Sequence, residues 1–134
     1  KLQKITALFN FEMIATVSQF GSNALYMTGD EFSDLDELFN QQAVNNLKIQ
    51  PDPYQGQNLF YRSDNVSFVK KKIIAHSFST VDMTTAKHYH QLNDDLEIVD
   101  FDNLTQIINN FGKTIEKLTP RNFAPKYTDQ VNFN

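Results

Sequence analysis

The sequence of 134 residues contains no cysteine and no tryptophan, and it has only four glycines, four prolines and three histidines. Without cysteine the chain forms no disulfide bond, no zinc site built on thiolates and no cysteine nucleophile. The absence says nothing about the compartment in which the protein works, because many exported bacterial proteins also lack cysteine.

Long apolar runs and broad basic patches are lacking as well. No window approaches the ~20 apolar residues that a membrane helix needs. The 12 basic residues are outnumbered by 16 acidic ones, and the only basic run is the three lysines at 70–72. Because that run lacks interleaved aromatic residues, we expect no nucleic acid as a partner, and because no apolar window is long enough, we expect no membrane. The first residues also lack the pattern of a signal peptide, which leaves a mature chain, a cytoplasmic one or a piece of a longer protein.

Periodicity predicts strands that alternate with helices. Residues 5–11 are almost continuously apolar, which is typical of a strand covered on both faces. The other predicted elements are strands at 24–28 and 73–79, helices at 33–47, 63–72 and 104–118, and a loop at 48–59 with a short extended piece before Pro51. This order predicts an α/β fold, a three-layer αβα sandwich with a largely parallel sheet. We expect one domain over residues 1–118 and assign no structure to the tail, residues 119–134.

Glu12 is the most informative candidate for a functional residue. It is the one charged residue in an apolar run, at or just past the carboxyl end of the first predicted strand, where α/β sheets bind their ligands. Burying its carboxylate costs several kcal/mol unless a cation or hydrogen-bond donors compensate it.

Two of the three histidines, His88 and His90, form the second candidate. Alternate residues of an extended segment point the same way, so two imidazoles could hold a zinc ion. The triplet is also common on ordinary surfaces, and a tetrahedral zinc site needs three or four ligands. His76 alternates with apolar residues inside a predicted strand, which favours a hydrogen-bonded histidine over a metal ligand.

Five short segments carry a resemblance to a known family. They are residues 10–14 (NFEMI), 59–68 (LFYRSDNVSF), 74–77 (IAHS), 89–94 (YHQLND) and 99–101 (VDF). In order and spacing the chain resembles, over about residues 4–118, the C-terminal half of the M28 zinc aminopeptidases. The resemblance implies an αβα sandwich with a mixed sheet, two zinc ions bridged by an aspartate and a water or hydroxide, and a peptide substrate. Residues 1–118 would then be the C-terminal half of a peptidase domain.

Residue by residue, the resemblance assigns the roles of zinc ligands to Glu12 and His90. Glutamate is found where the family usually has aspartate, which adds one methylene to the reach of the carboxylate. His88 then becomes an ordinary loop residue. The residues expected behind the ligands or along the substrate cleft are Asp64, Asp94, Tyr61 and Arg62. For Arg62 a structural ion pair is an equal alternative.

No segment resembles the family's N-terminal half, which carries the other zinc ligands and the general base. Because hydrolysis needs a base within hydrogen-bond reach of the attacking water, we expect this chain alone to be inactive and to be a fragment of a larger aminopeptidase. Two alternatives remain open: a glutaminyl-cyclase-like enzyme with a single zinc, and a non-catalytic binding domain on the same scaffold. Relatives with these motifs are commonly secreted or periplasmic, and the resemblance implies the same here.

The expected truncation has a structural consequence. Removing half of a sheet exposes the flank of the strand at residues 5–11, and a bare strand edge is a template for aggregation. We therefore expect either the missing N-terminal half of the same protein or a tight oligomer to cover it.

Overall fold

The computed structural model describes residues 1–86 and 95–134 of the chain. The strands and α-helices follow one another in the order β1 (Leu8–Phe11), β2 (Ala24–Met27), α1 (Leu35–Gln42), β3 (Lys48–Pro51), α2 (Val66–Val69), β4 (Ala75–Ser79) and α3 (Phe101–Lys117). No helix in the described residues has both the length and the apolar character to cross a membrane.

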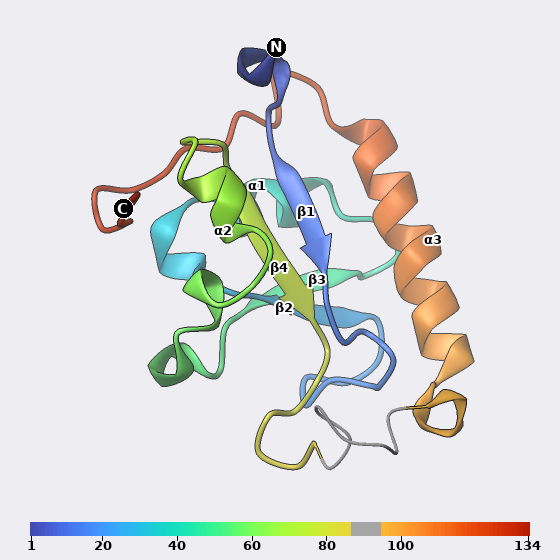
Figure 1. Ribbon diagram of the computed structural model, residues 1–134. Helices are drawn as coiled ribbons and strands as arrows, with labels where there is room; N and C mark the ends of the chain where they lie inside the picture. Colours follow the sequence, from blue (N-terminus) through green and yellow to red (C-terminus); the bar gives the residue numbers. More distant parts are fainter. Residues whose placement is uncertain (87–94) are drawn as a thin grey trace.

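The strands form one mixed sheet in the order β1-β4-β2-β3 (Figure 1). β1 pairs with β4, and β2 with β3, in parallel, whereas β2 and β4 are antiparallel. Helices α1 and α3 pack on one face of the sheet, where Phe123 at the start of the tail joins their core cluster. Helix α2 lies on the other face, together with Val131 and Phe133 from the end of the tail. The predicted three-layer α/β fold is confirmed, with two parallel pairs joined by one antiparallel pair.

Side chains of β1 alternate between the two helical layers. Phe9 and Phe11 face α3, where their ring centroids lie 5.2 Å and 4.9 Å from that of Phe111. Asn10 points to the opposite face, and its Nδ2 donates a hydrogen bond to Ser77 Oγ at 2.8 Å. The strand is therefore not apolar on both faces, as the sequence predicted, because one face is aromatic and the other becomes polar toward its carboxyl end.

Helix α3 is the element that the sequence predicted most closely. The side chain of Asp100 caps its first turn by accepting a hydrogen bond from the backbone N of Asn103 at 2.9 Å. Ile107 and Phe111, which lie one turn apart on one side of the helix, are buried in the core. The helix ends at Lys117, three residues before Pro120, as expected of a residue that cannot continue a helix.

Two other predicted helices are shorter than expected. Helix α1 ends at Gln42 rather than at residue 47, because the backbone leaves the helical region at Ala43, whose ψ is 135°. Asn45 and Asn46 follow with φ angles of 53° and 64°. Helix α2 is a single turn rather than a helix over residues 63–72, and Lys72, with a φ of 60°, lies in the same left-handed region. Left-handed residues cannot continue a right-handed helix, so neither helix can extend through these positions to its predicted limit.

The tail, residues 119–134, packs along the domain. The Tyr127 hydroxyl donates to the carbonyl of Ile73 at 2.7 Å and accepts from the backbone N of Ala75 at 3.0 Å, at the start of β4. The backbone N of Asn132 donates to the hydroxyl of Tyr61 at 2.8 Å. These contacts join the tail to β4 and to the turn at residues 59–61, and the domain boundary at residue 118 remains a prediction.

Candidate functional site

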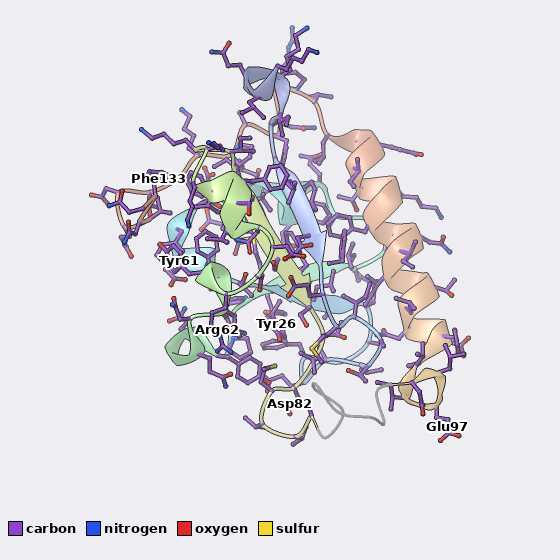
Figure 2. All side chains as sticks on the ribbon, in the orientation of Figure 1. Tyr26, Tyr61, Arg62, Asp82, Glu97 and Phe133 are labelled. Carbon is purple, nitrogen blue, oxygen red and sulfur yellow. The ribbon has the colours of Figure 1, made fainter. Side chains whose placement is uncertain are left out.

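A polar pocket lies where β1 and β4 reach their carboxyl ends, on the face of the sheet that carries α2. Glu12 and Arg62 are its charged residues, and the thioethers of Met13 and Met83 contribute apolar wall. Its hydroxyl groups belong to Tyr26, Thr28, Ser63, Ser77 and Ser79. The pocket is partly open to solvent, and its volume is about 60 Å³. Figure 2 labels Tyr26 and Arg62, which line it from β2 and from the loop before α2.

The backbone fixes Glu12 at the end of β1. Its N–H donates to the carbonyl of Phe78 at 3.0 Å, which continues the β1–β4 ladder by one residue. Its Oε1 accepts from Asn10 Nδ2 at 2.7 Å and, more weakly, from the backbone N of Asp64 at 3.4 Å. These donors partly compensate the carboxylate, as the sequence analysis required of any group placed there.

Three other predicted site residues lie in the segment that approaches Glu12. Asp64 is exposed and meets Glu12 through its backbone N. Arg62 lines the pocket and its Nη1 donates to the carbonyl of Gln57 at 3.1 Å, within its own loop. The hydroxyl of Tyr61 accepts a hydrogen bond from the tail. The structure thus brings Glu12 and Arg62 to one pocket, and their roles in a reaction remain predictions.

The remaining predicted site residues, His90 and Asp94, lie with His88 at positions 87–94, outside the described residues. In the described ranges, 1–86 and 95–134, no group of three or more histidine, cysteine, aspartate or glutamate side chains could hold a metal ion. Glu12 fits the role of one ligand. Both hydrogen bonds that its carboxylate accepts go to Oε1, so Oε2 remains available, and the carboxylate lines a pocket. One carboxylate is not a zinc site, which takes three or four ligands.

His76 is buried in the sheet and is held by two hydrogen bonds. Its Nδ1 lies 2.8 Å from the carbonyl oxygen of Thr28, and its Nε2 lies 2.7 Å from Ser33 Oγ. Because a carbonyl can only accept, Nδ1 carries the proton and Nε2 accepts from the serine hydroxyl. Burial lowers the pKa of His76 to about 4. The prediction of a hydrogen-bonded histidine is confirmed.

The polar side chains beside Glu12 were not predicted from the sequence. Asn10 and Glu12 alternate along β1, and Ser77 and Ser79 alternate along the paired strand β4, so all four face the same layer. The signal was an alternation of polar and apolar residues, which was overlooked because residues 5–11 were interpreted as apolar throughout.

Asp82, just beyond β4, was also missed. Its Oδ1 accepts from Thr84 Oγ1 at 2.6 Å, from the backbone N of Thr84 at 2.9 Å and from the Tyr54 hydroxyl at 2.9 Å. These hydrogen bonds, those from Thr84 first, lower the pKa of Asp82 to about 2. The spacing of Asp82 and Thr84 is typical of a side chain that caps its own turn, so the sequence did contain a signal for this group.

The fold and the pocket together define an α/β protein whose candidate site lies at the carboxyl ends of parallel strands, where such sheets bind ligands. The chain belongs to peptidase family M28, because the model of that family matches residues 1–115 of its 134 residues. The comparisons with curated proteins and with solved structures gave no match. Family membership confirms the resemblance and places the chain among the metallopeptidases.

Proposed function

We propose that this chain is part of a zinc-dependent aminopeptidase, which removes N-terminal residues from peptides. The observation that carries the proposal is the position of Glu12, a carboxylate that lines a pocket at the carboxyl end of β1 within the region that matches family M28. Parallel sheets bind substrates at this end of their strands.

Glu12 and His90 would hold zinc together with ligands that the described residues do not supply. The chemistry that zinc would supply there is that of a Lewis acid able to polarise a scissile carbonyl. Asn10 orients the carboxylate, because its Nδ2 donates to Glu12 Oε1 at 2.7 Å. Such an oriented ligand is the usual arrangement around a protein-bound metal. The side chains proposed behind the ligands or on the substrate side are Asp64, Asp94, Tyr61 and Arg62.

The residues that complete the site would come from the missing N-terminal half. The unpaired outer edge of β1 in the described sheet supports this part of the proposal. In the described sheet β1 is a terminal strand. Leu8 and Glu12 donate from their backbone N to Ile74 and Phe78 of the β4 side at 2.8 Å and 3.0 Å. The N–H and C=O groups of Phe9 and Phe11 therefore face away from β4, toward the open edge.

An apolar groove of about 380 Å³ runs beside that open edge, between β1 and α3. Phe11 and Ile14 line it from the strand side, and Ile108 and Ile115 line it from the helix. Phe11, Ile108 and Ile115 are 41%, 56% and 44% exposed. A strand laid along β1 would use the open backbone groups and cover these side chains. Because Phe11 precedes Glu12, the covering segment would also lie next to the proposed zinc site.

Zinc binding tests the role of Glu12. In equilibrium dialysis of the protein with its completing N-terminal half against buffered zinc, Glu12→Gln and His90→Gln are each expected to weaken binding by ~10-fold or more, since losing even a group behind a ligand costs 10- to 100-fold. Glu97→Gln is the matched control, because Glu97 is an exposed carboxylate on a turn away from the pocket (Figure 2). Equal zinc binding by wild type and Glu12→Gln would contradict the assignment.

Light scattering tests the open edge. Without its completing half, the isolated chain is expected to self-associate, because water-exposed apolar side chains and unpaired strand groups favour pairing with another chain. Ile108→Lys is expected to shift it toward monomer, whereas Leu96→Lys, which replaces a residue that is 75% exposed outside the groove, is expected to have little effect. A monodisperse monomer of the unmodified chain would count against the covering segment.

A further inference from the structure

The described sheet ends at β3 on the side opposite to β1. Parallel pairing with β2 uses the backbone of Lys48, whose N–H donates to the carbonyl of Asn23 at 3.3 Å. Successive residues of a strand point their backbone groups to opposite sides, so Ile49 and Pro51 present theirs to the outer edge of β3. A strand added at this edge would have to pair with these two residues.

The side chain of Asn40, near the end of α1, already occupies the outer edge of β3. Its Oδ1 accepts a hydrogen bond from the backbone N of Ile49 at 2.8 Å, and its Nδ2 donates to the carbonyl of Ile49 at 2.8 Å. A carboxamide offers an acceptor and a donor side by side, as a peptide group does. Asn40 therefore makes the two hydrogen bonds that the opposite residue of an added antiparallel strand would make.

Pro51 removes the next point of attachment on this edge. Proline has no N–H, so a neighbouring strand finds no donor at position 51. Lys48 is exposed, and a charged side chain on a terminal strand also opposes pairing. Solvent reaches the edge, because a hollow of about 410 Å³ lined by Asn40, Asn46 and Lys48 lies beside it. Hydrogen bonding by Asn40 and the missing donor of Pro51, rather than burial, close this edge.

The edge of β1 has the opposite character. Phe9 and Phe11 present their N–H and C=O groups away from β4, and the apolar groove lies beside them. We propose that Asn40 is an edge cap, which makes the sheet accept an added strand at β1 and exclude one at β3. The closure of β3 rests on the contacts of Asn40 alone. Only the choice of the missing N-terminal half as the natural occupant of β1 rests on the proposed function.

Hydrogen exchange followed by NMR tests Asn40 directly. In the 134-residue chain the backbone amide of Ile49 is expected to be protected, like that of Gln50, which faces β2. In Asn40→Ala the Ile49 amide is expected to exchange at least ~10-fold faster, because it loses its one acceptor, while the Gln50 amide stays slow. Gln41→Ala, the matched control, changes the exposed neighbour of Asn40 on α1 and is expected to leave both amides unchanged.

Equal exchange of the Ile49 amide in Asn40→Ala and in wild type would overturn the proposal. If Asn40→Ala folds poorly, the wild-type chain decides, because an Ile49 amide that exchanges as fast as that of an unstructured peptide excludes the cap. Neither measurement involves zinc or turnover, so the peptidase assignment can fail without affecting them.

Sedimentation velocity tests the consequence for assembly. Copies that pair through one open edge stop at a dimer, whereas copies with two open edges continue to grow. The wild-type chain is expected to reach a dimer and no larger species as its concentration rises, and Asn40→Ala/Pro51→Ala is expected to form larger species. A wild-type monomer would overturn the acceptance of a strand at β1. Wild-type species beyond the dimer, or a double variant that stops at the dimer, would overturn the closure of β3.

Discussion

Gly29→Ala is expected to destabilise the protein by about 3 kcal/mol, the sum of a strained left-handed backbone and an overpacked core. Gly29 has a φ of 69°, and a Cβ there would lie 2.6 Å from Phe60 Cγ and 2.8 Å from Phe32 Cδ2. Phe60 is buried, so its ring has little room to move. Urea unfolding monitored by circular dichroism measures the change.

Gly112→Ala is the matched control for Gly29→Ala. Gly112 lies inside α3, and a Cβ built there meets no atom within 4 Å. Alanine is expected to stabilise the helix by about 1 kcal/mol, because glycine loses more conformational freedom on folding. Opposite signs at the two glycines would show that backbone strain and packing at Gly29 together set the cost, and an unchanged midpoint for Gly29→Ala would contradict both.

Gly29 also lies next to residues that line the candidate pocket. Gly29 follows Thr28, a lining residue of the pocket, and Phe60 lies between the lining residues Leu59 and Arg62. Displacing the Phe60 ring would therefore move the loop that carries Arg62. In Gly29→Ala we expect the pocket to change shape at temperatures where the variant is still folded, which NMR shifts of Ser77 and Ser79 can report.

Lowering the pH from 7 to 4 is expected to remove about 3 kcal/mol of stability through His76 alone. The pKa of His76 falls from 6.5 to about 4 because the ring is buried, and each pKa unit corresponds to ~1.4 kcal/mol. The folded state keeps the ring neutral, whereas the unfolded chain binds a proton below pH ~6.5. The stability that His76 contributes is therefore fully present above its pKa in the unfolded chain, 6.5, and is lost as the pH falls toward its pKa in the folded protein, about 4.

Protonation of Asp36 increases the stability of the folded protein over part of the same pH range, which is opposite to the effect of His76. Burial raises the pKa of Asp36 from 3.8 to about 6, so the folded state binds the proton more readily than the unfolded chain and is favoured as the pH falls through that window. The contribution of His76 is isolated by comparing wild type with His76→Gln at pH 7 and pH 4.5 in urea unfolding. His76→Gln is expected to lose less stability on acidification than wild type, and Asp36→Asn is expected to lose more. Parallel pH profiles for wild type and His76→Gln would contradict a buried neutral ring.

Sequence patterns predicted the fold where local and tertiary preferences agree. The apolar residues of α3 recur at helical spacing in the sequence, and the helix forms within a few residues of its predicted limits. Helix α1 was predicted too long because its end depends on tertiary hydrogen bonds. Asn45 Nδ2 donates to Asn110 Oδ1 at 2.9 Å, and the Asn45 carbonyl accepts from Asn23 Nδ2 at 2.9 Å. Such long-range contacts leave no trace in a local periodicity.

The candidate site was predicted in part. Glu12 lies at the end of β1, as the interruption of an apolar run predicted, and the M28 assignment is confirmed by the family match. The hydroxyl groups that line the pocket were not predicted. They come from the region of β2, from β4 and from the loop before α2, and only the folded sheet brings them together. The tail escaped prediction because Tyr127 acts through single hydrogen bonds to β4 rather than through a periodic apolar face.

The central claim is that Glu12 and His90 are one part of a zinc peptidase site, and that the remaining ligands and the general base lie outside this chain. The most direct measurement is hydrolysis of an aminoacyl p-nitroanilide by the isolated 134-residue chain with and without added zinc. The account predicts no turnover above that of Glu12→Ala at any zinc concentration, because a zinc site without a positioned base does not activate water for attack. Zinc-dependent release of p-nitroaniline that disappears in Glu12→Ala would contradict it, since the chain would then contain a complete active site.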